Sequence, residues 1–554
     1  MRRLRKLGKA ARTIAMAAAV TVAVGSAGAR RTLAGDRDSD AETTTPIEHV
    51  VVIFQENVSF DHYFATYPHA KNLSGEPFFK AEDDTPTVNG LKGVLLSNNP
   101  NANNPANAPN AINPFRLDRS QASTCDQDHN YGHEQLAFDE GLMDFFPGST
   151  GTGANSFCAA QFAYGKDKGL VMGYFDGNTV TAMWNYAQNF AMNDNSYGTT
   201  FGPSTPGLLN LVAGNTYPAT TSASSPKLVG VSSGIGTLVG DLDPTGDVCS
   251  GPPTVQMGGQ NIGDLLTAKG ISWGSFMGGF DLTITNPSPS SGTGCKRMSP
   301  ATPANGGPTA DYIPHHAFFQ YWASTANPTH ARPTVPPSKY GTTADTGANH
   351  EYDIHDFFDA LNADNLPAVS FLKAPANMDG HAGYSDPLLE QEFVVNTINT
   401  IQKSKFWRNT AIIISYDDSD GWYDHQMSPI INPSAIASAD TKNSDQLNDP
   451  GECGNGSPTL KNAAGSPIEG RCGYGPRLPL IVISPWAKEN FVDNTLTDQS
   501  SILRFIEDNW STGRIGGGSF DAVAGNINHM FDFDDRHHGS IRRLLLDPST
   551  GQPL

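Results

Sequence analysis

The sequence is poor in charge, has no closely spaced cysteine pair and, after its first 24 residues, has no long apolar run. Only 17% of its 554 residues are charged and 38% are hydrophobic, a composition that excludes general disorder and can form a large core in one or two domains. No later segment approaches the ~18 apolar residues that a membrane-spanning helix needs. We therefore expect a folded chain with no transmembrane segment.

Positive charge is also scarce. The 36 Lys and Arg residues are outnumbered by 56 Asp and Glu residues, which gives a formal net charge of -20. Proteins that bind nucleic acids or anionic bilayers without specificity use basic surfaces. The sequence therefore argues against a nucleic-acid partner, and bound cations would offset part of its acidity.

The N-terminus predicts export. Residues 1–29 combine several basic side chains, the apolar stretch Thr13–Val24 and a small-residue cleavage sequence, as in a signal peptide. Residues 30–44 are polar and predict a flexible leader. A secreted or periplasmic location follows. The pair Arg2-Arg3 leaves twin-arginine export open, although general secretion fits the following residues better.

The six cysteines all follow this leader. An even number in an exported protein predicts disulfides, and the absence of CxxC spacing argues against a zinc ribbon or a thioredoxin-like site. The sequence alone does not choose among the possible pairings. We expect neighbours in the sequence to pair: Cys125 with Cys158, Cys249 with Cys295, and Cys453 with Cys472.

Short apolar runs and amphipathic segments occur along the chain. The runs predict buried strands and the amphipathic segments predict helices, and their alternation is typical of a doubly wound α/β sheet that is mostly parallel and flanked by helices. Loop-rich insertions interrupt the pattern, among them residues 98–113, whose Asn, Pro and Ala predict a surface loop. The expected strands are Val50–Phe54, Ala368–Leu372, Ala411–Ser415 and Leu478–Ile483, and the expected helices are Leu388–Gln402 and Ser501–Trp510.

Two of these strands end in oxygen-bearing side chains. Glu56 and Asn57 follow the first strand, and Asp417 and Asp418 follow the third. Ligands of open α/β sheets bind at the carboxyl ends of the strands, and hard oxygen donors favour a divalent cation. If the two strands are neighbours, the four side chains form a metal site. The alternative is that they begin two solvated loops.

A hydroxyl group suited to covalent catalysis occurs in the segment TTFGPSTPGLLNLVAG. Ser204 and Thr205 precede Pro206, a residue favoured in the first turn of a helix, and an apolar helical segment follows. A hydroxyl at this position lies at the positive end of a helix dipole, where an alkoxide and a phosphoryl group are both favoured. The alternative is a plain helix N-cap.

Histidines occur in turn-rich segments, where each could bind a phosphate or a metal, although a lone histidine more often has a structural role. The candidates are His129, His315, His316, His381 and His425.

Six ordered segments of the chain resemble the bacterial phosphoesterase family of secreted phospholipases C and acid phosphatases, which is similar to the alkaline-phosphatase-like superfamily. The resemblance implies a catalytic domain over residues 45–515 and a C-terminal extension over 516–554. The segments are IEHVVVIFQENVSFDHYF, CDQDHNYGHEQLAFDEGLMDFF, DNSYGTTFGPSTP, DGHAGYSDP, ISYDDSDGWYDH, and GPRLPLIVISPW with SSILRFIEDNW.

The resemblance also implies roles for single residues. Ser204 would be the nucleophile, with Thr205 as a fallback, and three histidines would hold phosphoryl oxygens or protonate the leaving group. The divalent metal ion, of uncertain identity, would be held by Glu56, Asn57, Ser204, Asp417 and Asp418, and the histidines would be His129, His316 and His381, with His315 the less certain of its pair.

Two departures from the phospholipase C pattern favour a phosphomonoesterase of acid-phosphatase type, with phospholipase C as the alternative. Phospholipases of the family typically have Asp-Glu-Asn-Gly-Gly where this chain has Asp417–Gly421, and Asn-Arg where it has Gly207-Leu208. Gln499 replaces a histidine of many phospholipase relatives, and we give it no catalytic role. The oligomeric state stays open.

Two other functions compete with this prediction. The segment Gly230–Gly234 matches the G-x-S-x-G motif of serine esterases, but a Gly- and Pro-rich stretch follows it instead of the required helix. A non-catalytic, calcium-stabilised surface binding protein would also use the Asp417–Gly421 loop, but the spacing fails the EF-hand register and Ser204 would have no role.

Overall fold

The computed structural model describes residues 42–153, 167–285, 292–299, 309–534 and 541–554. The predicted signal peptide, most of the predicted leader and Cys158 lie outside these described residues. Within the described ranges, no helix is long and apolar enough to cross a membrane.

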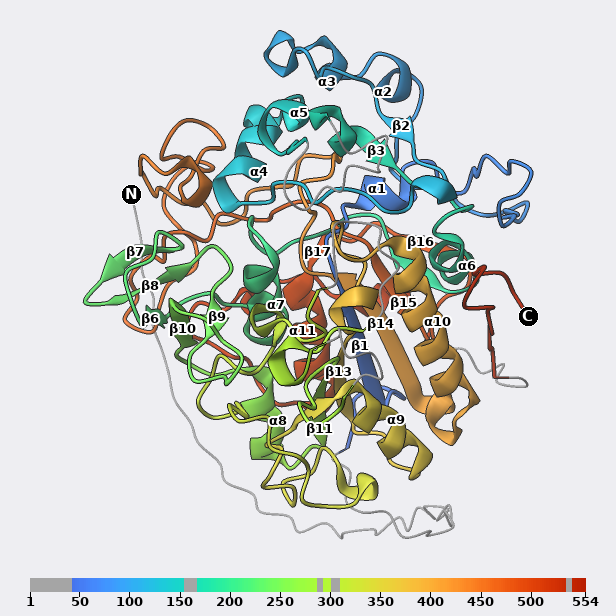
Figure 1. Ribbon diagram of the computed structural model, residues 1–554, viewed down its shortest axis with the longest axis vertical. Helices are drawn as coiled ribbons and strands as arrows, with labels where there is room; N and C mark the ends of the chain where they lie inside the picture. The colour runs from blue at the N-terminus through green and yellow to red at the C-terminus, as the bar shows by residue number, and fades with distance from the viewer. Residues whose placement is uncertain (1–41, 154–166, 286–291, 300–308, 535–540) are drawn as a thin grey trace, which may run out of the picture. The chain divides into compact units, whose positions relative to one another are not determined.

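A central sheet of eight strands organises the structure (Figure 1). Its strands are parallel to their neighbours except β15, which is antiparallel to the strands on either side. The predicted α/β class with a mostly parallel sheet is confirmed. In spatial order the strands are β12 (Glu351–Asp353), β11 (Trp273–Met277), β13 (Val369–Lys373), β1 (His49–Gln55), β14 (Thr410–Tyr416), β15 (Leu480–Ile483), β4 (Ala191–Asn193) and β16 (Phe491–Asp493).

The strands β1 and β14 are neighbours in the middle of this sheet. Their sequences, HVVVIFQ and TAIIISY, are buried almost throughout, as expected of strands covered on both faces. They pair in parallel, with His49 opposite Thr410 and Gln55 opposite Tyr416. Residues that follow the two strands therefore emerge at the same edge of the sheet.

Helices cover both faces of the sheet (Figure 1). On one side α7 packs against α8 and α11, and on the other α6 packs against α10. The predicted helices over Leu388–Gln402 and Ser501–Trp510 are confirmed as α10 and α11. The bounds are α6 (Thr181–Asn189), α7 (Ser204–Ala213), α8 (Ile262–Lys269), α9 (Ile354–Asn362), α10 (Pro387–Lys403) and α11 (Gln499–Trp510).

Shorter elements occupy the connections. A second sheet has the order β7-β8-β6-β10-β9, and two pairs of short strands, β17 with β5 and β2 with β3, complete the set. The bounds are β2 (Phe115–Arg116), β3 (Gly173–Tyr174), β5 (Ser196–Tyr197), β6 (Ala219–Thr221), β7 (Leu228–Ser232), β8 (Ile235–Leu238), β9 (Asp243–Pro244), β10 (Thr254–Met257), β17 (Thr497–Asp498), α1 (Phe60–Phe64), α2 (Val94–Ser97), α3 (Pro100–Asn103), α4 (Tyr131–Phe138) and α5 (Phe146–Ser149).

Two disulfides link loops of the chain, and the C-terminal segment packs along α10. Two of the expected bridges are present, Cys249–Cys295 and Cys453–Cys472. The last residues run along α10, where Asn399 Nδ2 donates to Leu546 O at 2.7 Å and Gln402 Nε2 donates to Leu544 O at 2.8 Å.

The segment 98–113 is mostly exposed or half-buried, as predicted for a surface loop, but it also holds buried asparagines. It contains α3, and three of its asparagines are at most 2% exposed, because their amides replace backbone hydrogen-bond partners. Asn99 Nδ2 donates to Leu95 O at 2.8 Å, and Asn101 Nδ2 donates to Met143 O at 2.8 Å. The third is Asn107.

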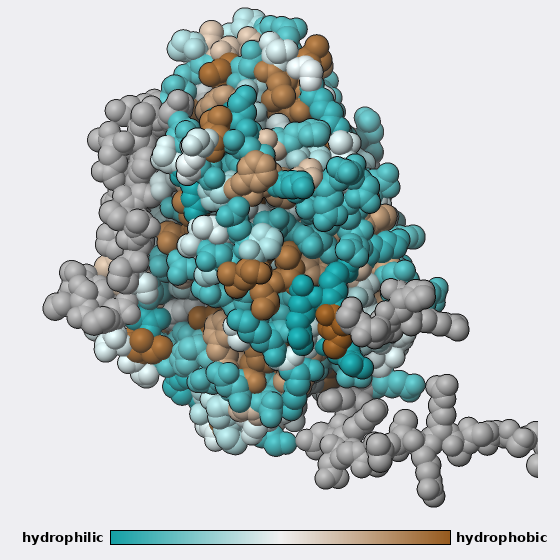
Figure 2. Space-filling model, turned by 90° about the vertical axis from the view of Figure 1, so that its right-hand side faces the viewer, coloured by the Kyte–Doolittle hydropathy of each residue, from teal (hydrophilic) through white to brown (hydrophobic). Residues whose placement is uncertain are grey.

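On the face drawn in Figure 2, hydrophobic residues form separate groups between hydrophilic ones. The exposed large hydrophobic residues of the described chain are likewise spread over distant segments, such as Phe78, Leu142, Val231 and Val523.

Candidate active site

The carboxyl ends of β1 and β14 bring the two predicted acidic pairs together. The Asn57 N–H donates to Asp417 Oδ1 at 2.9 Å, and the Val58 N–H donates to the carbonyl oxygen of Asp418 at 2.9 Å. Glu56, Asn57, Asp417 and Asp418 are each at most 2% exposed. These side chains therefore form one buried group and do not begin two solvated loops.

Ser204 joins this group from the N-terminus of α7. Its Oγ lies 3.1 Å from Glu56 Oε2 and 3.2 Å from Asp418 Oδ2. The helix begins at Ser204, and its N-cap residue, Pro203, makes no side-chain capping hydrogen bond. The hydroxyl thus contacts two carboxylates instead of capping the helix, and it lies at the positive end of the helix dipole.

The close approach of α7 to the strand ends depends on Gly207. A Cβ atom at this position would collide with the backbone of Asp417. Gln499 holds the same backbone, since its Nε2 donates to the carbonyl oxygens of Tyr416 at 3.0 Å and Asp417 at 2.5 Å. Gln499 is therefore placed to position Asp417.

Thr205 points away from the carboxylates. Its Oγ1 donates to the carbonyl oxygen of His315 at 3.2 Å, and its N–H donates to Asp241 Oδ1 at 2.9 Å. Of the two candidate hydroxyls, only that of Ser204 contacts the acidic group.

The two histidines of the pair His315-His316 have different surroundings. His316 is buried, and its Nδ1 lies 3.2 Å from Glu56 Oε1. The His315 ring is 31% exposed and faces Asp243, with 3.5 Å between Nδ1 and Oδ1. His316 is thus the member of the pair that contacts the acidic group.

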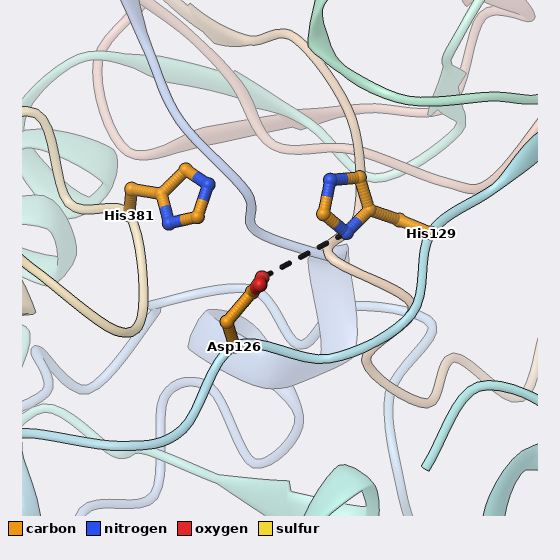
Figure 3. Close-up of side chains that lie close together, drawn as sticks. All are labelled: Asp126, His129 and His381. Atoms are coloured by element: carbon orange, nitrogen blue, oxygen red, sulfur yellow. Dashed lines mark ion pairs between the residues drawn. The ribbon is translucent and has the colours of Figure 1, made fainter. Parts of the chain in front are cut away.

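The other two predicted histidines, His129 and His381, lie near each other with their ring planes almost perpendicular (Figure 3). Their ring centroids are 6.3 Å apart. His129 Nδ1 lies 3.2 Å from Asp420 Oδ1, and the His381 N–H donates to Asp379 Oδ1 at 3.0 Å. Asp420 also accepts from Asn57 Nδ2 at 3.1 Å, so it connects His129 to the acidic group.

Sequence reasoning missed Lys373, the last residue of β13. Its ammonium forms an ion pair with Glu56 Oε1, lies 4.0 Å from Asp417 Oδ2 and is 1% exposed. The position could have been found, because β13 neighbours β1 and Lys373 ends its apolar run just as the acidic residues end theirs. A second omission, Asp379, accepts from the Glu56 N–H through its carbonyl oxygen at 3.0 Å.

The acidic group carries an excess of buried negative charge. Burial, followed by the charge of Asp417, raises the pKa of Glu56 and the pKa of Asp418 well above the usual carboxyl range. Lys373 lowers the pKa of Glu56 only in part. Burial, followed by electrostatic repulsion from the neighbouring basic side chains of His315 and Lys373, lowers the pKa of His316 well below its usual value.

The pKa of His129 shifts in the opposite direction from that of His316. Burial alone would lower its pKa, but the carboxylates of Asp418 and Asp420 outweigh burial and raise it well above the usual value. The ring is therefore suited to carry a positive charge where His316 is not.

These residues fit a divalent cation. Asn57 Oδ1 and Asp417 Oδ2 are buried, and neither has a hydrogen-bond partner among the described residues. Buried oxygens of this kind are costly unless a cation or a donor compensates them. Carboxylate, amide and hydroxyl oxygens are the donors that Mg²⁺, Ca²⁺ and Mn²⁺ prefer, although they do not fix the ion's identity.

Neither competing function fits the geometry. The G-x-S-x-G segment forms the tight turn between β7 and β8, with positive φ at Ser233 (52°) and Gly234 (79°), and no helix follows it as a nucleophile elbow requires. The Asp417–Gly421 loop is buried beside Ser204, which does not suit a calcium loop on the surface.

The model of the Phosphoesterase family matches residues 47–513, and the chain belongs to this family. The predicted family is thereby confirmed.

Several relatives in sequence are named phospholipases C. The chain is 23% identical to the non-hemolytic phospholipase C of Pseudomonas aeruginosa over 529 residues, which covers 91% of this chain and 60% of that protein. It is 24% identical to phospholipase C A of Mycobacterium tuberculosis over 504 residues, covering 88% of this chain and 78% of that protein. The chain thus spans about three fifths of the length of the Pseudomonas relative.

Solved structures show a weaker likeness. Murine ectonucleotide pyrophosphatase/phosphodiesterase 5 matches with a TM-score of 0.29 and 13% identity, covering 64% of this chain and 95% of that chain. A protein of the alkaline phosphatase superfamily from Vibrio parahaemolyticus matches with a TM-score of 0.25 and 12% identity, covering 60% of this chain and 62% of that chain. At these scores the likeness establishes nothing further about this chain.

Proposed function

We propose that the protein is a metal-dependent phosphoric ester hydrolase with Ser204 as its nucleophile. One observation carries the proposal: the Ser204 hydroxyl opens α7 and lies 3.1 and 3.2 Å from two buried carboxylates of an oxygen-rich group. A hydroxyl, a set of cation ligands and a helix N-terminus are the three components that phosphoryl transfer to a side chain needs.

Each residue then has a role. Glu56, Asn57, Asp417 and Asp418 hold the cation together with Ser204. When bound, the cation neutralises phosphoryl oxygens and favours the alkoxide of Ser204.

Ser204 Oγ attacks phosphorus in line, the bond from phosphorus to the leaving oxygen breaks, and a phosphoserine ester remains. Water then cleaves the phosphoserine and restores the hydroxyl. Histidines hold the non-bridging oxygens or protonate the leaving oxygen. The raised pKa of His129 suits the first task, because a protonated ring attracts anionic oxygens. The other two are His316 and His381.

The first candidate substrate is a phospholipid phosphodiester. The relatives that cover most of this chain are named phospholipases C, and these names favour this substrate over a monoester. In this case the leaving group is a diacylglycerol, and phosphocholine is released from Ser204.

A phosphate monoester is the second candidate, supported by one of the two departures from the phospholipase pattern. Asp420 stands where phospholipases of the family typically have Gly, and its carboxylate lies 3.2 Å from His129. The other departure carries less weight, because Leu208 is fully buried in the core.

The test is a paired assay of the metal-loaded protein on phosphatidylcholine vesicles and on a small aryl phosphate, with and without chelator. We expect chelator-sensitive release of phosphocholine, and in Ser204→Ala a loss of about 1,000-fold or more with the fold unchanged. The matched control Thr205→Ser removes one methyl group from the neighbouring hydroxyl and should stay active.

Phosphate release from the monoester alone would move the substrate to the second candidate. Hydrolysis of neither ester, or unchanged turnover in Ser204→Ala, would overturn the proposal.

A further inference from the structure

A second pocket, with a volume of about 390 Å³, is lined by other residues than those of the Ser204 site. Three parts of the chain form it: the segment that follows α1, the segment that leads into α2, and the paired strands β2 and β3. Figure 1 shows β2 and β3 apart from α7, which carries Ser204. The volume is typical of small-molecule sites, and we call this the Arg116 pocket.

Arg116 is held in a fixed orientation in this pocket. Its Nε lies 2.8 Å from Asp176 Oδ2, and its Nη2 lies 2.7 Å from Glu76 Oε2. The side chain is 16% exposed, and its Nη1 has no hydrogen-bond partner among the described residues. A guanidinium fixed in this way loses little conformational entropy when a ligand binds, and it keeps one nitrogen to donate to an anion.

Two lysines give the pocket a net positive charge. The two carboxylates compensate Arg116, but Lys71 and Lys92 form no ion pair within the described part of the chain. Lys92 Nζ donates to the carbonyl oxygen of Val88 at 3.0 Å, and Asp176 fixes the backbone of Lys71 by accepting its N–H at 2.8 Å. In a chain of formal net charge -20, this is a local site for an anion.

Part of the lining is apolar. Tyr67 and Leu91 are buried, and Leu96 is half-buried. Leu73 and Val94, each two residues from one of the lining lysines, are 50% and 69% exposed. Apolar surface is therefore available both inside the pocket and next to it.

We propose that the Arg116 pocket binds an amphiphilic anion, a molecule with an acidic head group and an apolar chain. The head group pairs with Lys71 and Lys92 and accepts from Arg116 Nη1, and the chain packs on Leu91 and Leu96. A neutral lipid would leave the lysines without a partner, and an inorganic anion would leave the apolar wall in water. Binding at this pocket does not depend on hydrolysis of any ester.

The first probe is octylphosphonate, which has an anionic head group, an apolar chain and no ester bond. Its binding to the full-length, metal-loaded protein is measured by isothermal titration calorimetry in phosphate buffer, in which inorganic phosphate competes for the site at Ser204. We expect about one bound molecule per chain. Methylphosphonate, which lacks the chain, should bind at least about 100-fold more weakly.

The double variant Lys71→Ala/Lys92→Ala removes the uncompensated charges. Both side chains are exposed, so the fold should not change, and affinity for octylphosphonate should fall by at least about 10-fold. The matched control is Lys80→Ala/Lys269→Ala, which removes two exposed lysines that do not line the pocket. The control should bind the probe normally.

Vesicles distinguish the two sources of such a ligand, a bilayer and a dissolved amphiphile. Ser204→Ala, which should leave the lipids intact, is sedimented with phosphatidylcholine vesicles that contain or lack phosphatidylglycerol. Binding that requires phosphatidylglycerol and is lost with the two lysines would support a bilayer lipid as the ligand. Binding of octylphosphonate without binding of vesicles would support a dissolved amphiphile.

Absence of octylphosphonate binding, equal affinity for methylphosphonate, or unchanged affinity in the double lysine variant would overturn the inference. None of these measurements involves hydrolysis. A protein that binds the probe through this pocket but cleaves no ester contradicts only the proposed function, and an active protein that does not bind the probe contradicts only this inference.

Discussion

The segments that follow β1 and β14 each supply acidic residues to two buried clusters. The first, the Ser204 cluster, consists of Glu56, Asp417, Asp418 and Ser204. The second, the Arg477 cluster, consists of Asp61, Asp424, His425 and Arg477. All their residues are buried except His425, which is half-buried, and both join the same two segments, but they compensate their negative charge differently.

In the Arg477 cluster each carboxylate has a cationic partner. Arg477 Nε lies 3.1 Å from Asp424 Oδ2, and Arg477 Nη2 lies 3.1 Å from Asp61 Oδ1. His425 Nδ1 lies 2.6 Å from Asp61 Oδ2, and the backbone N–H groups of Asp61 and Gln426 donate to the two oxygens of Asp424. His425, a candidate ligand by sequence, therefore has a structural role here.

In the Ser204 cluster the compensation is incomplete. Lys373 pairs with Glu56, but Asp417 Oδ2 and the adjacent Asn57 Oδ1 have no hydrogen-bond partner among the described residues. The difference teaches that burial of acidic residues does not by itself identify a functional site. Oxygens without partners add to the case for the Ser204 cluster because they lie together beside one hydroxyl, whereas single ones such as Tyr186 Oη and Thr397 Oγ1 also occur elsewhere in the described chain.

The largest effect on stability is expected from breaking the satisfied cluster. Arg477→Leu leaves Asp61 and Asp424 buried without their cation and should lower the free energy of unfolding by about 3–5 kcal/mol. Urea unfolding measures the change. The control is Lys405→Ala, since Lys405 pairs with Asp364 on the surface and should cost less than about 1 kcal/mol. Equal losses in the two variants would contradict the comparison.

A smaller effect on stability is expected at a third buried carboxyl group, whose hydrogen-bond partners are hydroxyl groups instead of a cation. Glu390 is buried, and its oxygens each accept from a tyrosine hydroxyl at 2.6 Å, from Tyr63 and from Tyr416. Burial raises the pKa of Glu390 to about 7, although these hydrogen bonds lower it in part. The folded protein therefore keeps a proton that the unfolded chain loses near pH 4.5, so stability falls as pH rises from about 4.5 to about 7.

Glu390→Gln removes this dependence. Between pH 5 and pH 8 the free energy of unfolding of the unmodified protein should fall by about 2–3 kcal/mol more than that of the variant. Urea titrations of both proteins at the two pH values measure the difference, and other titrating groups cancel between them. Parallel pH profiles would show that Glu390 ionises normally in the folded protein.

The sequence predicted the parts of the fold that depend on local pattern. β1 and β14 were found because their apolar runs are continuous. Their adjacency was the condition for the predicted metal site, and the structure supplies it. Ser204 was found because a proline and an apolar helix follow it. Lys373 was missed because a lysine after a strand usually extends into solvent, and only the neighbouring β1 shows that this one is buried.

Other errors have a similar cause. Asn99 was assigned to a surface loop because composition does not show that its amide has partners inside the protein. Its Nδ2 donates to Leu95 O and to the Tyr423 hydroxyl. Asp126 and Asp420 were not singled out because their proximity to His129 depends on loops whose paths the sequence does not determine.

The most direct test of the cation-dependent Ser204 cluster is Asp418→Asn, measured for both stability and turnover. Because burial and Asp417 raise the pKa of Asp418, removing its charge should leave the metal-free fold as stable or more stable. Turnover should fall by about 1,000-fold or more, and the rise in melting temperature on adding the cation should shrink. A variant that keeps its turnover, or whose metal-free fold is destabilised as strongly as that of Arg477→Leu, would contradict the account.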